Sequence, residues 1–332
     1  FRLAIVLVFI FSVINLPFLP NQNIVNQKNF SSKANSFVQA SVPNLSLSSY
    51  FGGDGQDSLT LSTIDSAGNF YLVGNSTSTN FPLKAPFQDR SKGASELTVV
   101  KLSPSGELLY STYIGGANEE RPRQIKMDKA GNLYVLGTTN SRNFPTQNAF
   151  QPTYTKTSTE AFSITKLSPS GQVIYSTYVG RGGEINDPFT FTVDDTGNVY
   201  MAGVTSARKF LLLNAFQNLY GNREDFRDND SDAFLLKLAP NGDGIFSTYL
   251  GGIGDENILG IKLDVLGNIY IAGTTVSKSF PTRNPVQKKF GGASDGFVAK
   301  FSPRGEAIYS TYLGGRGFEY SRHFYLLYIL GW

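Results

Sequence analysis

The residues best suited to chemistry are carboxylates that recur at one position of a repeated sequence. Residues 111–116, Ser-Thr-Tyr-Ile-Gly-Gly, return along the chain in close variants. An acidic residue stands seven positions after the tyrosine in every copy except the third, which has Ile185 there. The acidic residues at this position are Asp57, Glu120, Glu256 and Glu319. Because hard cations prefer oxygen ligands, a near-ring of these carboxylates could bind Ca²⁺ or a cationic ligand. The alternative, favoured by the recurrence, is that each carboxylate accepts hydrogen bonds from its own glycine-rich inter-blade loop.

A second acidic cluster interrupts one repeat only. Asp228, Asp230 and Asp232 form an Asp-x-Asp-x-Asp pattern within the insertion 223–232. The spacing is similar to half of a calcium-binding loop, but Ala233 stands where that loop needs glycine, and no suitably placed glutamate follows. The pattern therefore favours a solvated surface loop, with a local contact site as the alternative.

Composition excludes several classes of site. The chain of 332 residues has no cysteine and one histidine, His323, so disulfides, thiolate metal sites and a cysteine nucleophile are excluded. A triad or metal centre that needs several histidines is excluded as well. The net charge of +3 is spread along the chain, which gives no indication of nucleic-acid binding. We predict no cofactor, apart from the Ca²⁺ considered above.

The elements that must position these residues follow from the repeat. Equivalent tyrosines stand at 50, 113, 178, 249 and 312, so the period is 63 to 71 residues. Each unit contains the turn Asp-x-x-Gly-Asn-x-Tyr, and most contain a Ser-Pro-x-Gly turn. Around these turns we predict four strands, represented by residues 124–128, 133–137, 98–102 and 108–113 of their units.

A four-stranded sheet with two apolar faces must be covered on both sides. Stacking such sheets around an axis is the propeller solution, and a β-helix is the structural competitor. We predict an all-β fold, a β-propeller of four-stranded antiparallel blades, with four complete blades plus partial blades at each end in a truncated or open ring. The predicted β-propeller region is 45–332, with units at about 51–113, 114–178, 179–249 and 250–312 and a partial fifth at 313–332.

A lysine stands in the middle of the third predicted strand of every unit. These lysines are Lys101, Lys166, Lys237 and Lys300. A buried lysine needs a partner, and the aspartates of the Asp-x-x-Gly-Asn turns are the candidates. We expect structural pairing within the blade. We also expect the tyrosines at 113, 178, 249 and 312 to be blade-packing residues rather than a carbohydrate-stacking ring.

Several motifs occur together in the order of a known repeat. Residues 128–134, 143–145, 149–151 and 176–178 together resemble the bacterial SBBP β-propeller repeat family, whose name denotes a seven-bladed propeller. The resemblance covers roughly residues 45–320. It implies an exported protein of bacterial or archaeal source, and it supplies no catalytic residues.

The first residues differ in composition from the repeats. Residues 1–19 are predicted to be a signal peptide or an N-terminal anchor, and residues 20–44 a flexible linker. The expected location is extracellular, at the cell surface or in the periplasm, with membrane contact only through such an anchor. The leading functional hypothesis is a non-catalytic module that binds protein or glycan. The alternatives are a glycan hydrolase or lyase with carboxylates on the channel face, and a structural spacer of a larger surface protein.

Overall fold

The computed structural model describes residues 48–154, 160–180, 185–208, 210–222 and 230–315. Within these ranges the chain forms β-strands and one short 3-10 helix, Tyr220–Asn222. None of the described helical residues forms a segment long and apolar enough to cross a membrane. The first two sheets contain β1 (Asp57–Ile64), β2 (Phe70–Ser76), β3 (Glu96–Leu102), β4 (Leu108–Ile114), β5 (Glu120–Met127), β6 (Leu133–Thr139), β7 (Ala161–Leu167) and β8 (Val173–Val179). The other two contain β9 (Ile185–Val193), β10 (Val199–Thr205), β11 (Asp232–Leu238), β12 (Gly244–Leu250), β13 (Glu256–Leu263), β14 (Ile269–Thr275), β15 (Asp295–Phe301) and β16 (Ala307–Leu313).

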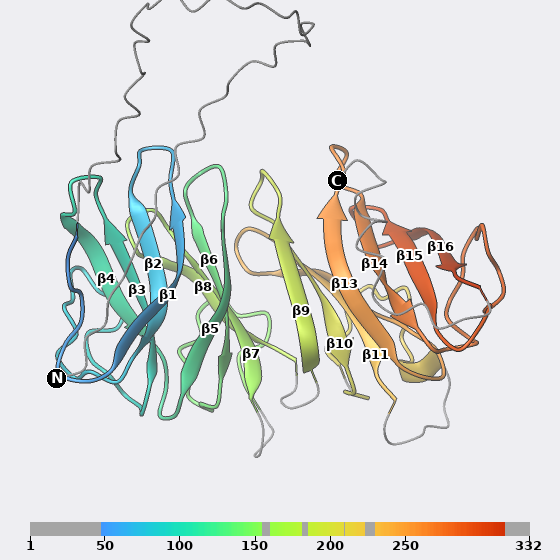
Figure 1. The fold of residues 1–332 in the computed structure, drawn as a ribbon, viewed down its shortest axis with the longest axis horizontal. Helices are drawn as coiled ribbons and strands as arrows, with labels where there is room; N and C mark the ends of the chain where they lie inside the picture. The colour runs from blue at the N-terminus through green and yellow to red at the C-terminus, as the bar shows by residue number, and fades with distance from the viewer. Residues whose placement is uncertain (1–47, 155–159, 181–184, 209, 223–229, 316–332) are drawn as a thin grey trace, which may run out of the picture.

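The strands form four antiparallel sheets, and each sheet pairs its four strands in chain order. The sheets stand next to one another in sequence order and do not close into a ring (Figure 1). Strands β1, β5, β9 and β13 contact one another in succession, so the first strand of each sheet is the inner one. The prediction of four complete four-stranded blades is confirmed, and the β-helix is excluded.

The repeated turns use glycine where the backbone requires it. In the first turn, Gly68 has φ of 81° and its N–H donates to the Asp65 carbonyl at 3.0 Å. Asp65 Oδ1 accepts hydrogen bonds from the backbone N–H groups of Ala67 and Asn69. Only the glycine has positive φ here. Asn69 instead donates its side-chain N–H to Asp65 Oδ2 at 2.8 Å, so it locks the aspartate in place.

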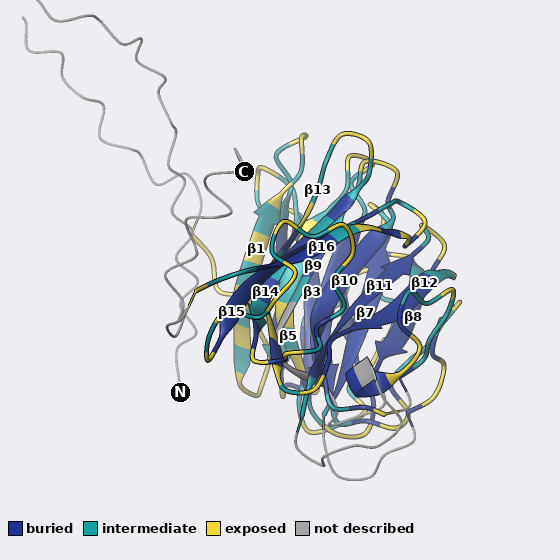
Figure 2. Ribbon diagram, turned by 90° about the vertical axis from the view of Figure 1, so that its right-hand side faces the viewer, coloured by how far each residue is buried: buried dark blue, intermediate teal, exposed yellow. Residues whose placement is uncertain are grey.

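Burial differs between the inner strand and the other three. Strands β6, β7, β10 and β11 are buried at every residue, as expected for sheets covered on both faces. By contrast, β1 alternates between exposed and half-buried residues along its whole length (Figure 2). The inner strand therefore presents one row of side chains to solvent, where the sequence alone indicated uniform burial.

An aromatic ring and a lysine recur at each junction between neighbouring sheets. The ring of Tyr110 lies on Gly171 of the next sheet, where an added methyl group would come within 2.8 Å of it. Lys101 Nζ crosses the same junction and donates to the Pro169 carbonyl at 2.9 Å. The same lysine lies 3.6 Å from Asp65 Oδ2 of its own sheet. Pairing with the turn aspartate was predicted, whereas the bond to the following sheet was not.

Replacing Lys166 by methionine should lower the free energy of unfolding by about 2 kcal/mol, because the buried Pro240 carbonyl and Asp128 lose their cation. Lys300 provides the matched control. It lies 3.5 Å from Asp264 Oδ2, but it donates to no following sheet among the described residues and is more exposed. Lys300→Met should cost less than half as much in urea denaturation, and equal losses would contradict a bridging role for the lysine.

Some predicted segments lie outside the described residues. These are the signal peptide or anchor at 1–19, the linker at 20–44, and residues 316–332 of the partial fifth unit. A partial blade was predicted to begin at residue 45, before the first complete unit; its residues 48–51 are described and are not in a strand. In this segment Phe51 packs edge to face on Phe81, with ring centroids 5.3 Å apart.

Candidate functional site

Two sets of loops meet at one end of the sheets. The glycine-rich loop that enters each sheet is held by side chains of the loop between the second and third strands. In the second sheet, Ala117 N–H donates to Asn143 Oδ1 at 2.9 Å, and Asn118 N–H donates to Ser141 Oγ at 2.8 Å. In the first sheet, Gly55 N–H donates to Ser78 Oγ at 2.8 Å. These side chains hold the glycine-rich loops whose backbone N–H groups bond to the repeated carboxylates.

The repeated carboxylates begin the inner strands rather than lying in the preceding loops. Asp57, Glu120 and Glu256 are the first residues of β1, β5 and β13. Each accepts a hydrogen bond from the backbone of its glycine-rich loop, with Gly116 N–H 3.2 Å from Glu120 Oε2. Glu120 Oε1 also accepts the Thr139 hydroxyl at 2.7 Å. Binding of a cation by these carboxylates stays a prediction, and no group of three or more metal-ligating acidic or histidine side chains occurs within the described ranges.

A second repeated acidic position begins the third strand of three sheets, and its repetition was not recognised from the sequence. These residues are Glu96, Asp232 and Asp295, and all three are buried. Each accepts a hydrogen bond from the backbone of the loop before its strand, as Asp232 Oδ2 does from Gly221 N–H at 2.8 Å. Asp232 Oδ1 has no hydrogen-bond partner. These acids stand at one register position, opposite Ser76, Thr205 and Thr275 in the second strands.

The two kinds of acid meet across the junction between sheets. A methyl group added to Gly115 would lie 1.9 Å from Glu96 Oε2 and 2.3 Å from Glu120 Oε2, so both carboxylates face one point. Gly251 stands in the same relation to Asp232 and Glu256. We name Glu96 with Glu120, and Asp232 with Glu256, the junction pairs. Glycine is required at the meeting point because any side chain would occupy the space of the carboxylates.

Burial of the junction pairs shifts their protonation. Burial, together with the charge of the neighbouring Glu96 carboxylate, raises the pKa of Glu120 to about 7. Burial and the charge of Asp232 raise the pKa of Glu256 well above its usual range. Burial also raises the pKa of Asp232 to about 7. The pairs therefore hold protons at pH values at which exposed carboxylates are ionised.

The junction between the second and third sheets lacks both acids. Ala161 begins β7 and Ile185 begins β9, in the places that acids occupy at the other two junctions. Both acids are absent together, so the two positions vary as a pair. This joint loss was the signal in the sequence that could have revealed the pairing.

The remaining predicted site residues are not assembled into one site. Glu319 and Asp228 lie outside the described residues. The Asp230 carbonyl accepts a hydrogen bond from the Tyr220 hydroxyl. Asp232 belongs to a buried strand and a junction pair, so it does not lie in a solvated surface loop.

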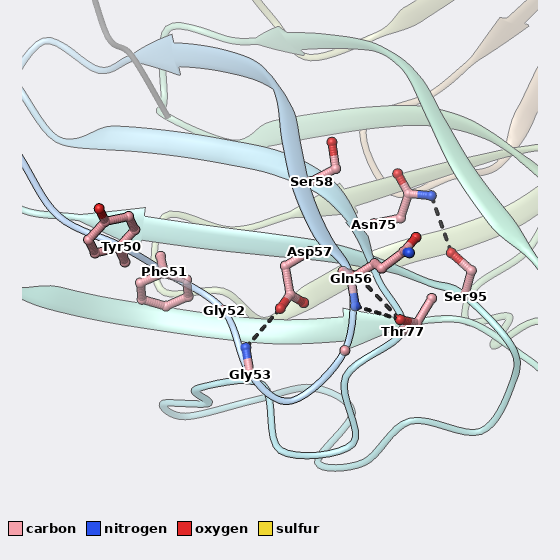
Figure 3. A pocket seen from close by; sticks show the side chains of 11 residues that line it. Tyr50, Phe51, Gly52, Gly53, Gln56, Asp57, Ser58, Asn75, Thr77 and Ser95 are labelled. Carbon is pink, nitrogen blue, oxygen red and sulfur yellow. Dashed lines mark hydrogen bonds between the residues drawn. The ribbon is translucent and has the colours of Figure 1, made fainter. Parts of the chain in front are cut away.

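A pocket of about 670 Å³ opens beside Asp57 at the entrance of the first sheet. Its wall consists of the glycine-rich loop, two aromatic residues and the polar residues Gln56, Ser58, Asn75, Thr77 and Ser95 (Figure 3). Asn75 Nδ2 donates to Ser95 Oγ at 3.2 Å, and Thr77 Oγ1 accepts the Gln56 N–H at 2.8 Å. Tyr50 is 71% exposed at the rim. Asp57 is the single ionisable carboxylate of this wall, and its oxygens are bonded to Ser76, Ser78 and Gly53.

Comparison with known proteins identifies one repeat. The SBBP family model, described as a beta-propeller repeat, matches residues 109–145. The match runs from the last strand of the first sheet to the loop after β6, so it contains Gly115 and Glu120. No curated protein sequence matches the chain. The predicted resemblance is thereby confirmed at this repeat.

Proposed function

We propose that this chain, which carries SBBP beta-propeller repeats, is a non-catalytic binding module whose pocket beside Asp57 takes a neutral glycan. The observation that carries the proposal is the composition of the pocket wall. It offers amide and hydroxyl groups, which pair with sugar hydroxyls, and an exposed tyrosine ring, which can cover an apolar sugar face. Its carboxylate is already occupied by hydrogen bonds of its own loop.

The acids of the described junctions and of the pocket are poorly suited to glycoside hydrolysis. Hydrolysis needs two carboxylates about 5 to 10 Å apart on either side of a scissile bond. The junction pairs are buried and face a glycine backbone, so a substrate cannot reach them. The pocket wall contributes one carboxylate. This arrangement supports binding over catalysis.

The proposed location is outside the cytoplasm, at the cell surface or in the periplasm. It is supported by the apolar run in residues 1–19 and the polar segment that follows it. A reporter fused after residue 44 should be exported when residues 1–44 are intact. Retention of the reporter in the cytoplasm would contradict this location.

Glycan-array screening of the full chain, followed by calorimetry on the strongest neutral glycan, tests the binding. Tyr50→Ala should weaken the binding of that glycan by about tenfold, because the variant loses the stacking surface at the rim. Val265→Ala, at a fully exposed residue of the fourth sheet, should leave the affinity unchanged. Absence of binding to any glycan would overturn the proposal and favour a spacer role.

A further inference from the structure

The last sheet presents a face that the other three sheets use to bind the sheet that follows. In the first three sheets, an aromatic residue of the fourth strand lies on the glycine of the next sheet's final turn. Phe246 lies on Gly305 in this way, where an added methyl group would come within 2.6 Å of the ring. The equivalent residue in the last sheet is Tyr309, which pairs with Lys300 as Phe246 pairs with Lys237. Among the described residues, no turn glycine lies under Tyr309.

Two other side chains of the last sheet lack the contact that their equivalents make. Lys237 Nζ donates to the Pro303 carbonyl at 2.8 Å, whereas Lys300 makes no such bond within the described part of the chain. Phe216 packs on Phe301 of the next sheet, with ring centroids 5.8 Å apart. At the equivalent position Val286 is 90% exposed. One apolar, one aromatic and one cationic group are thus available on one face.

The first sheet presents the surface that receives the ring and the lysine at the other junctions. Its turn at residues 103–106 has the conformation of the turns that receive the aromatic ring and the lysine, with φ of 83° at Gly106. Gly171, Gly242 and Gly305 are buried under a ring, but Gly106 is only half-buried. No described lysine donates to the Pro104 carbonyl. The two sheets lie at opposite ends of the open array, so these two surfaces cannot meet within one molecule (Figure 1).

We propose that the outer face of the fourth sheet, formed by Val286, Lys300 and Tyr309, binds the first sheet of a second copy of this chain at its turn 103–106. The interface continues the pattern of the three junctions already present, with the same lysine-to-carbonyl bond and the same ring on glycine. It is heterologous, so association is head to tail and either closes into a ring or extends. The mass of the assembly distinguishes these two forms.

Sedimentation velocity of the full chain over a concentration series tests the proposal. A species of at least twice the monomer mass should grow with concentration. Val286→Arg should weaken association by about tenfold, because an uncompensated charge would enter an apolar contact. Leu266→Arg is the matched control, since Leu266 is also largely exposed in the same sheet and its equivalents Ala67, Ala130 and Thr196 are exposed at the tips of their turns.

A charge exchange tests the register of the interface. In the junction between the second and third sheets, Phe150 packs on Gly244, which is the first residue of the fourth strand of the third sheet. The residue of the first sheet equivalent to Gly244 is Leu108. Leu108→Glu alone should also weaken association, and adding Val286→Arg should restore most of it. Melting curves verify that each variant is folded. A wild-type chain that stays monomeric at all concentrations, as expected if the face binds another protein, would overturn the proposal. Equal weakening by Leu266→Arg would overturn it as well.

Discussion

Replacing Gly115 with alanine is expected to lower the free energy of unfolding by about 4 kcal/mol, one of the largest effects of any single methyl group in this chain. The new Cβ would lie 1.9 Å from Glu96 Oε2 and 2.3 Å from Glu120 Oε2. Neither side chain can move away without breaking buried hydrogen bonds. Glu96 accepts the Gly93 N–H at 2.8 Å, and Glu120 accepts the Thr139 hydroxyl. Urea denaturation followed by circular dichroism measures the loss.

The naturally acid-free junction suggests the control for this substitution. Ala161 stands where Glu96 stands one sheet earlier. In a Glu96→Ala background the methyl group at Gly115 meets one carboxylate instead of two, and the cost of Gly115→Ala should fall by at least about 1 kcal/mol. An unchanged cost in the double variant would show that the clash lies with the backbone and not with the junction pair.

Local features of the fold could be predicted because each turn carries its own chemical signature. Gly68 supplies the positive φ, Asp65 binds the N–H groups ahead of it, and the apolar segments on either side become β1 and β2. The same residues recur in four units, so one correct interpretation applied to all of them. The confirmed strands follow directly from this repetition.

Contacts across the junctions could not be predicted from one unit. The partner of Lys101 at Pro169 is 68 residues away, and nothing within a single repeat identifies it. The position of Glu96 was not recognised as a repeat feature because it is glutamate in one unit, alanine in another and aspartate in two. Glu120, by contrast, follows an invariant tyrosine at fixed spacing. A residue whose role depends on the neighbouring sheet becomes visible only when two units are aligned across their boundary.

The function of the acids also depends on burial, which the sequence left open. Both interpretations of Glu120, cation ligand and loop cap, are consistent with its spacing. The structure shows it buried against another carboxylate and bonded to Gly116 and Thr139. Burial of Glu120 beside this carboxylate therefore makes the stability of the fold depend on pH.

The stability of the folded chain is expected to fall as pH rises from about 4.5 to about 7. Burial raises the pKa of Glu120 from 4.5 to about 7 in the folded protein, so folding takes up a proton within this window. An acid with a raised folded pKa stabilises fully below its unfolded pKa and loses that stabilisation as pH passes the folded value. For Glu120 the loss amounts to about 3 kcal/mol. Asp232, whose pKa is raised to about 7 by burial, acts in the same direction.

The turn aspartates make the stability of the fold decrease at low pH. Hydrogen bonds from Asn268 and Leu266, with the charge of Lys300, lower the pKa of Asp264 to about 2. An acid with a lowered folded pKa loses its stabilisation as pH falls below the unfolded value of 3.8. Maximal stability is therefore expected near pH 4 to 5, lower than for most proteins.

Glu120→Gln separates the contribution of the junction pair from that of the rest of the chain. The glutamine cannot ionise, so the difference in unfolding free energy between pH 5 and pH 8 should shrink by about 3 kcal/mol. At pH 8 the variant should be more stable than the wild type, because it avoids burying a second negative charge beside Glu96. Glu107→Gln, at a residue whose side chain is 70% exposed, should leave the pH profile unchanged. A variant with the full wild-type slope would mean that Glu120 is ionised in the folded state and held by a cation, the interpretation that the spacing of the repeated carboxylates first allowed.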